Sequence, residues 1–237
     1  MILAAGRGTR LAPLTDDTPK PLIEVGGRTL LDRVARRLVD AGADRLIVNV
    51  HDHAERIAAH LDALELGVEI AISREAEEPL ETGGGVLHAA HLIRRPGPFL
   101  LHNADIITEI DLRALLAAQV ERGPLATLAV HERPTSRFLL FDAEGLVGWE
   151  NTATGRAHRA RGARGEVRRL AFAGIHAIDP RFLDLVEERG VFSIMDPYLR
   201  LAAAGERILP LDVSGVLWLE IGSPERLDAA RRAMGSA

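Results

Sequence analysis

The first 25 residues, MILAAGRGTRLAPLTDDTPKPLIEV, constrain this chain more than any other stretch. A short apolar run over residues 1–5 leads into a turn that contains Gly6 and Gly8. Only glycine lets the backbone approach a ligand closely enough for its N–H groups to surround a phosphate. The stretch therefore predicts a β-strand that ends at a phosphate-binding turn.

Two basic side chains follow the glycines. Arg10 offers a planar fork that suits phosphate oxygens, and Lys20, between two prolines, adds a compact point charge. Lys20 is the only lysine among the 29 basic residues, so the other 28 are arginines. A lysine retained in such an arginine-rich chain indicates an ammonium group that arginine cannot replace. Together these residues predict a cradle for a triphosphate.

Two other glycine-loop motifs do not fit the sequence. The dinucleotide-binding motif G-x-G-x-x-G would need its third glycine at Leu11, and Pro13 is incompatible with the interior of an early helix. The P-loop motif G-x-x-x-x-G-K-[ST] does not occur in the chain. A generic dehydrogenase or a P-loop kinase is therefore excluded.

Composition narrows the class of protein. A chain of 237 residues with 47% hydrophobic and 27% charged residues is long enough for one α/β domain with a sizeable core. It has no cysteine, and its net charge of −5 gives no general attraction to nucleic acid or to anionic membranes. No apolar run reaches the roughly 20 residues that span a bilayer, and residues 1–5 are too few for a signal peptide. We expect a cytoplasmic enzyme, and the strand that starts at Met1 leaves open whether residues precede it.

Apolar runs alternate with helical patterns up to residue 130. The patterns predict helices over 28–41, 54–64, 84–93 and 111–122, and strands over 45–50, 68–73, 98–103 and 125–130. This alternation predicts an open, mostly parallel sheet with helices on both faces.

The pattern changes after residue 130. A hairpin is expected over 137–149 and an exposed, arginine-containing loop over 151–165. Further strands are predicted over 170–178, 208–211 and 216–219, and helices over 181–189, 195–204 and 224–234. Ser223 and Pro224 suit the first positions of the last helix.

Several motifs in order along the chain resemble one family. They are GRGTRLAPLT…TPKPLIEVGGRTLLD, LETGGGV at 80–86, FLLHNADII at 99–107, FAGIHAI at 172–178 and WLEIGSPERL at 218–227. This series resembles the sugar-1-phosphate nucleotidyltransferases. Within that family, LETGGG and the compact length resemble N-acetylmuramate-1-phosphate uridylyltransferases most, followed by mannose-1-phosphate guanylyltransferases.

The resemblance implies a fold and a reaction. The fold is the nucleotide-diphospho-sugar transferase fold: a Rossmann-like sheet with a small β-rich part, in one domain whose residues 1–130 bind nucleotide and residues 131–237 bind sugar. The reaction is Mg²⁺-assisted in-line attack of a sugar 1-phosphate, expected to be N-acetylmuramate 1-phosphate, on the α-phosphorus of a nucleoside triphosphate, expected to be UTP. Pyrophosphate leaves. Positioning and charge neutralisation are central to such phosphoryl transfer.

The resemblance also assigns residues. Gly8, Thr9 and Arg10 hold the β- and γ-phosphates, Lys20 supports the reacting α-phosphate, and the turns 4–6 and 81–83 frame base and ribose. The expected nucleotide contacts are Ala4, Ala5, Gly6, Gly8, Thr9, Arg10, Lys20, Glu81 and Gly83. Asn103, Glu150 and Gly174 are expected at the sugar phosphate, and Arg10, Lys20 and Asp105 are the expected catalytic residues.

Asp105 is the best metal candidate from the residues themselves. It follows the apolar run FLLHNA, at the carboxyl end of a predicted strand, where open α/β sheets bind ligands. Mg²⁺ prefers oxygen ligands from one or two carboxylates together with phosphates. The family's second carboxylate is an aspartate in W-x-D-x-G, but this chain has Glu220 in WLEIG, which leaves direct or water-mediated coordination open. Ala104 stands where the family commonly has glycine.

Two questions stay open from the sequence. No second lysine exists to take the position that longer relatives use near Glu150, so we hypothesise that nearby arginines neutralise the sugar phosphate. Glu220 and Ala104 also motivate a rival of another class, a catalytically silent regulatory subunit that senses nucleotide sugars. The sequence likewise leaves a homo-oligomer open.

Overall fold

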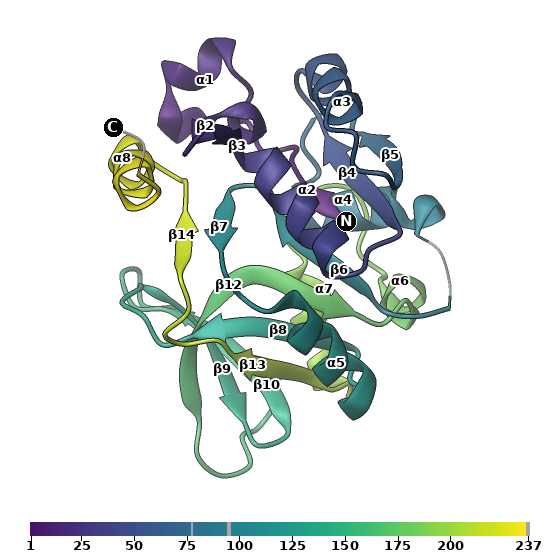
Figure 1. The fold of residues 1–237 in the computed structure, drawn as a ribbon. Coiled ribbons are helices and arrows are strands. Elements are labelled where there is room, and N and C mark those ends of the chain that lie inside the picture. Colours follow the sequence, from purple (N-terminus) through teal and green to yellow (C-terminus); the bar gives the residue numbers. More distant parts are fainter. Residues whose placement is uncertain (77, 94–95, 236–237) are drawn as a thin grey trace.

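The structure is a computed structural model that describes residues 1–76, 78–93 and 96–235. Its main element is a ten-stranded sheet in which β11, β10, β9, β12, β6, β1, β4 and β5 lie side by side in that order. Strand β8 pairs with β12, and β13 pairs with β8 (Figure 1). The sheet therefore branches at β12.

The first half of the chain forms the parallel part of this sheet. Its strands are β1 (Ile2–Leu3), β4 (Arg45–Val50), β5 (Glu69–Arg74) and β6 (Phe99–Asn103). Short β1 lies between β4 and β6, because Ile2 is in register with Val48 on one side and with His102 on the other. The carboxyl ends of the parallel strands consequently meet at one edge.

The second half adds further strands, which are antiparallel to their neighbours except for β13, which runs parallel to β8. They are β8 (Ala126–His131), β9 (Arg137–Asp142), β10 (Gly145–Asn151), β11 (Arg156–Arg159), β12 (Arg168–Ile178) and β13 (Ile208–Asp212). Two small pairs lie outside the large sheet: β2 (Glu24–Val25) with β3 (Arg28–Thr29), and β7 (Ile106–Thr108) with β14 (Trp218–Glu220).

Helices cover both faces of the sheet, as predicted. One apolar core contains Ile2 and Leu31 and lies under α2 (Leu30–Asp40), α3 (Ala54–Asp62) and α5 (Leu112–Arg122). The other contains Met1 and Val86 and lies under α4 (Glu81–His88), α6 (Arg181–Leu185) and α7 (Met195–Ala203). Successive residues of β1 point into opposite cores, because the side chains of a strand alternate between the two faces of the sheet.

The remaining elements are brief helical turns and the C-terminal helix. They are η1 (Thr9–Leu11), α1 (Leu14–Asp17), η2 (Lys20–Leu22), η3 (Ala90–Leu92) and α8 (Pro224–Ala233). As predicted, Ser223 caps α8 by accepting the N–H of Arg226. Asp111 caps α5 in the same way. A third apolar cluster, containing Ile23, Ile221 and Leu227, joins α8 to the N-terminal segment.

Three sequence predictions were wrong in detail. The helix predicted over 181–189 ends at Leu185, because the chain then turns extended to pass along α4. The helix predicted to start at 84 starts at Glu81. The loop expected over 151–165 contains the exposed edge strand β11, and β7 was not predicted at all.

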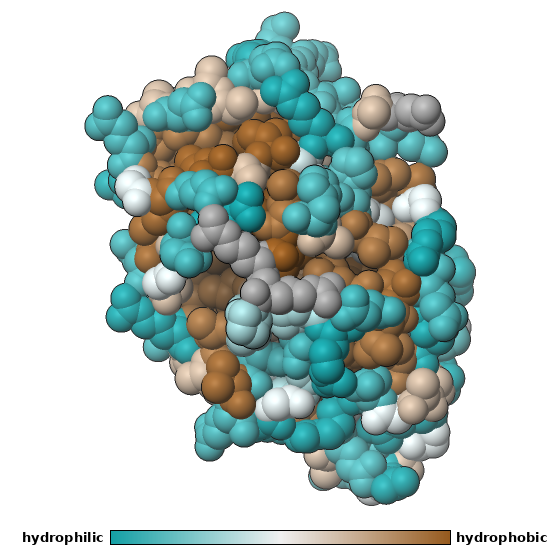
Figure 2. Space-filling view, turned by 90° about the vertical axis from the view of Figure 1, so that its right-hand side faces the viewer, coloured by the Kyte–Doolittle hydropathy of each residue, from teal (hydrophilic) through white to brown (hydrophobic). Residues whose placement is uncertain are grey.

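The surface carries both hydrophilic and hydrophobic side chains. Figure 2 shows one face on which hydrophilic side chains surround separate hydrophobic areas. Among the described residues, no helix is both long and apolar enough to cross a membrane. The cytoplasmic location and a homo-oligomer stay predictions.

Candidate active site

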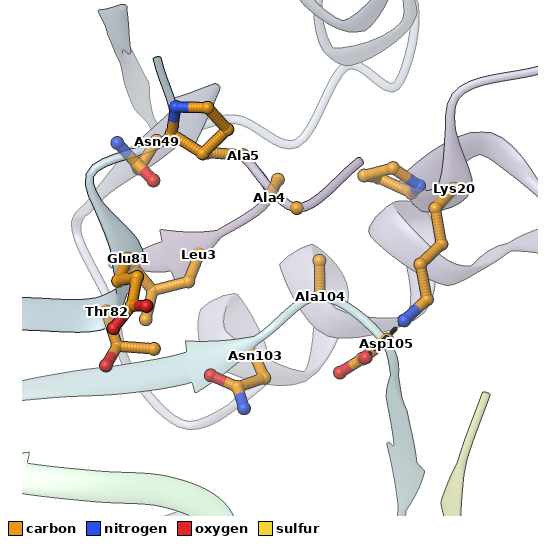
Figure 3. A pocket seen from close by; sticks show the side chains of 13 residues that line it. Leu3, Ala4, Ala5, Lys20, Asn49, Glu81, Thr82, Asn103, Ala104 and Asp105 are labelled. Atoms are coloured by element: carbon orange, nitrogen blue, oxygen red, sulfur yellow. Dashed lines mark hydrogen bonds and ion pairs between the residues drawn. The ribbon is translucent and has the colours of Figure 1, made fainter. Parts of the chain in front are cut away.

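The main candidate site is a pocket of about 310 Å³ at the carboxyl ends of β1, β4 and β6 (Figure 3). Its lining comes from the glycine turn, η2, the start of α4 and the end of β6. The lining residues are Leu3, Ala4, Ala5, Gly6, Lys20, Pro21, Asn49, Pro79, Glu81, Thr82, Asn103, Ala104 and Asp105. Most of the predicted nucleotide contacts are therefore in one place.

The N-terminal turn folds back onto Lys20. Gly8 has a left-handed backbone with φ of 66°, and a Cβ at that position would lie 3.0 Å from Cβ of Lys20. The Thr15 hydroxyl donates to the Gly8 carbonyl at 3.1 Å and fixes the turn. The two prolines around Lys20 place it in the single 3-10 turn η2. Glycine is needed at position 8 because the backbone there is left-handed and a Cβ would have too little room.

Lys20 and Asp105 form an ion pair at the edge of the pocket (Figure 3). Asp105 follows β6, and the preceding Ala104 donates its N–H to the Leu3 carbonyl at 3.0 Å. The side chains of Lys20 and Asp105 are 12% and 23% exposed, so both charges are largely withdrawn from solvent yet open to the pocket. The arrangement places a cation and an anion beside the glycine turn.

Glu220 lies next to Asp105 because β14 pairs with β7. Glu220 is in register with Ile106, and the Ile221 N–H donates to the Asp105 carbonyl at 2.9 Å. In this structure the Glu220 carboxylate forms an ion pair with Arg226. Two carboxylates on adjacent backbone segments fit a Mg²⁺ ion, which completes its ligand set with phosphates and water. No cluster of three or more metal-ligating side chains occurs among the residues that the structure describes.

Arg10 lies on the same side of the site as Glu220. A Cβ at Gly222 would be 3.0 Å from Oε1 of Glu220 and 3.3 Å from Nη2 of Arg10. Arg10 itself is exposed, on η1. Thr9 is exposed on the same turn. The structure thus places Arg10 between the glycine turn and the Glu220 carboxylate.

Asn103 and Gly174 come together, whereas Glu150 lies elsewhere. Gly174 has φ of 75° at an irregularity of β12, and a Cβ there would lie 2.9 Å from Nδ2 of Asn103 and 2.3 Å from Cδ1 of Ile106. Glu150 is buried on β10 and pairs with Arg169 at 2.7 Å. Of the three residues predicted at the sugar phosphate, the structure brings together Asn103, at the end of β6, and Gly174, at the bend of β12.

The expected glycine turn at 81–83 is instead the first turn of α4. Glu81 lines the pocket with φ of 60°, but Gly83 is buried, and a Cβ there would lie 2.4 Å from Cε2 of Phe192. The N–H of Gly83 donates to the Phe192 carbonyl at 3.0 Å. The glycine is required because the segment before α7 crosses the helix here. Only Glu81 of this predicted pair faces the pocket.

Sequence reasoning missed a buried polar pair behind the pocket. Nδ2 of Asn49 donates to Oε1 of Glu75 at 2.8 Å, and the Leu80 N–H donates to Oε2 of Glu75 at 2.9 Å. Asn49 is 1% exposed and Glu75 is 4% exposed. The pair anchors the start of α4 to β4. The asparagine inside the apolar run RLIVNV was the available signal.

Two buried histidines lie in the sheet beneath the site. Burial lowers the pKa of His102 to about 4, and its Nδ1–H donates to the Asn103 carbonyl at 2.8 Å. Burial also lowers the pKa of His176 to about 3, and its Nδ1 lies 3.1 Å from the Tyr198 hydroxyl. Both rings are therefore neutral near pH 7.

A glycine turn after the central strand, a lysine and two carboxylates at the carboxyl edge of an open sheet define a nucleotide-binding α/β protein. Comparison with known proteins narrows this class to one family. The family described as "Nucleotidyl transferase" matches residues 1–150. The chain is 33% identical over 258 residues to an N-acetylmuramate alpha-1-phosphate uridylyltransferase of Caulobacter vibrioides, covering 100% of this chain and 97% of that protein.

A more distant relative and a solved structure agree with this assignment. The chain is 31% identical to a mannose-1-phosphate guanylyltransferase catalytic subunit beta of Drosophila pseudoobscura pseudoobscura, over 95% of this chain and 59% of that protein. A UDP-glucose pyrophosphorylase from Acinetobacter baumannii shares the fold with a TM-score of 0.81 at 18% identity, over 99% and 92% of the two chains. The chain belongs to the nucleotidyl transferase family, and the resemblance to sugar-1-phosphate nucleotidyltransferases is confirmed.

Proposed function

We propose that this nucleotidyltransferase transfers a uridylyl group from UTP to N-acetylmuramate 1-phosphate. The match to the Caulobacter vibrioides enzyme supports this pair of substrates, because it extends over both chains almost completely. In the reaction, a phosphate oxygen of the sugar 1-phosphate forms a bond to the α-phosphorus of UTP. The bond between that phosphorus and the bridging oxygen breaks, and pyrophosphate leaves with the electron pair.

The observation that carries the mechanism is the ion pair of Lys20 with Asp105 beside the glycine turn. Lys20 holds the α-phosphate at the reacting phosphorus, and its charge offsets the negative charge that gathers there in the transition state. Arg10, with the backbone N–H groups of Gly8 and Thr9, holds the β- and γ-phosphates and therefore the leaving pyrophosphate.

Asp105 and Glu220 would hold the Mg²⁺ ion. Their backbone segments are joined by the hydrogen bond from Ile221 to Asp105, so the two residues lie on neighbouring segments of the chain. The ion, when bound, neutralises charge on the phosphate oxygens. Before nucleotide binds, each carboxylate is neutralised by a basic side chain, Lys20 or Arg226.

The remaining assignments divide the site between the two parts of the chain. Ala4, Ala5, Gly6 and Glu81, in residues 1–130, would contact base and ribose, since they line the same pocket. Asn103 and Gly174 would lie against the acceptor, and residues 131–237 would contribute most of the sugar site. Glu150 is proposed only as a support for that part, because its carboxylate pairs with Arg169.

The test is pyrophosphate release across a panel of nucleoside triphosphates and sugar 1-phosphates, with Mg²⁺ or with EDTA. We expect the highest kcat/KM for UTP with N-acetylmuramate 1-phosphate, and no release in EDTA. A preference for GTP with mannose 1-phosphate would instead make the chain a guanylyltransferase, which the likeness to the Drosophila subunit favours as second candidate. Nucleotide-sugar binding without pyrophosphate release from any pair would identify a regulatory subunit.

A further inference from the structure

We propose that Arg133 binds an anionic group of the acceptor sugar, either its phosphate or a carboxylate. This inference rests on the proposed function and names a substrate-binding residue that the family motifs do not contain. Arg133 lies between β8 and β9, and its guanidinium stacks on Trp218, whose indole N–H donates to the residue before Gly174.

The guanidinium of Arg133 is held in place by two aromatic rings. Its Cζ lies 4.3 Å from the ring centroid of Trp218, and its Nε–H donates to Nε2 of His131 at 2.8 Å. The His131 ring in turn packs edge-on against Trp218 with centroids 4.8 Å apart. Stacking and a hydrogen bond fix the orientation of an arginine before it meets a ligand.

Trp218 connects this arginine to the acceptor end of the site. The indole N–H of Trp218 donates to the Ala173 carbonyl at 2.9 Å, directly before Gly174. Trp218 and Glu220 are two residues apart on β14, so their side chains leave the same face of the strand. Arg133 therefore lies on the side of the site that also holds the second carboxylate.

Among the residues that the structure describes, no acidic side chain pairs with Arg133. Burial has the largest effect on the pKa of Arg133 and lowers it, whereas the nearby negative charge of Glu220 raises it. Within the described part of the chain, Glu220 forms its ion pair with Arg226, and no carboxylate lies within ion-pair distance of Arg133. Nη1 of Arg133 makes only a long contact of 3.5 Å with the Pro134 carbonyl. A half-buried guanidinium with unused N–H groups is suited to an incoming anion.

The proposed acceptor supplies such anions. Every sugar 1-phosphate carries a phosphate dianion, and N-acetylmuramate carries a lactyl carboxylate in addition. The only lysine of the chain is already assigned to the nucleotide. An arginine fork can hold either a phosphate or a carboxylate through two parallel hydrogen bonds.

The test compares two acceptors that differ in the lactyl group, N-acetylmuramate 1-phosphate and N-acetylglucosamine 1-phosphate, at saturating UTP. The variants are Arg133→Met, which keeps the apolar stem on Trp218, and Arg133→Lys, which keeps the charge. Arg137→Met, an exposed arginine of the neighbouring strand β9, is the matched control. We expect Arg133→Met to lower acceptor kcat/KM about tenfold to 100-fold, with the KM for UTP changed less than about twofold.

The two acceptors distinguish the two anions. An equal loss with both shows that Arg133 binds the phosphate, and a loss with N-acetylmuramate 1-phosphate alone shows that it binds the carboxylate. Unchanged kcat/KM with both acceptors, or a matching rise in the KM for UTP, would overturn the proposal. If Arg133→Met does not fold, partial retention of acceptor kcat/KM by Arg133→Lys supports the proposal, and full retention counts against a bidentate contact.

Failure of the proposed function gives a different result. A parent protein that uses neither acceptor refutes the assigned substrate pair. The variants are then measured with the sugar 1-phosphate that the substrate panel identifies. A selective loss of acceptor kcat/KM still supports the role of Arg133, and no loss refutes it. A parent protein that releases no pyrophosphate with any acceptor refutes both proposals.

Discussion

Lowering the pH should destabilise this fold in part through two histidines beneath the pocket. Burial lowers the pKa of His102 to about 4 and that of His176 to about 3, whereas histidine in an unfolded chain titrates near 6.5. Between pH 6.5 and these lower values, the unfolded chain binds protons that the folded chain does not, so stability falls as pH falls. From pH 7.5 to pH 5, each histidine should cost roughly 2 kcal/mol, and the pair roughly 4 kcal/mol.

Urea unfolding followed by tryptophan fluorescence at the two pH values measures this loss. The double variant His102→Gln/His176→Gln cannot take up these protons, so its free energy of unfolding should fall by roughly 4 kcal/mol less than that of the parent. His158→Gln, at an exposed position of β11, should leave the parent's pH dependence unchanged. The reasoning is refuted if the parent and the double variant lose the same free energy to within about 1 kcal/mol.

Four further substitutions test the proposed site. Lys20→Met and Asp105→Asn should each lower kcat at least about 100-fold with no loss of thermal stability, and near-parental turnover in either variant would contradict its role. Glu220→Ala should raise the Mg²⁺ concentration for half-maximal activity about tenfold or more, and an unchanged Mg²⁺ titration would exclude Glu220 as a ligand. Gly174→Ala should lower the free energy of unfolding by about 1–3 kcal/mol, because its Cβ would clash with Ile106 at a left-handed position, and unchanged urea unfolding would contradict this.

The parallel half of the fold could be predicted because its signals are local. The run RLIVNV forms β4 over the predicted residues, and the helix after it begins at residue 54 as the pattern indicated. The glycine turn could likewise be placed near Asp105, because the carboxyl ends of parallel strands share one edge of the sheet. Local periodicity and one topological rule are sufficient for that part.

The contacts that complete the site could not be predicted in this way. Strands β7 and β14 have three residues each, too few to show periodicity, and they pair across more than 100 positions of the chain. That pairing brings Glu220 to Asp105. The buried state of Gly83 likewise depends on Phe192, which lies far along the sequence. The arginines that pair with Glu150 come from β11, which is next to it, and from β12, which lies beyond β9 in the sheet.

Strand β12 has a consequence for how the chain can be divided. Its eleven residues pair with β9 at one end and with β6 and β8 at the other. A chain cut after residue 130 would end inside β8 and would leave β6 with an open, apolar edge. Such an edge can pair with other chains and promotes aggregation. Residues 1–130 and 131–237 should therefore unfold in one cooperative transition, and neither should be obtainable as a separate stable fragment.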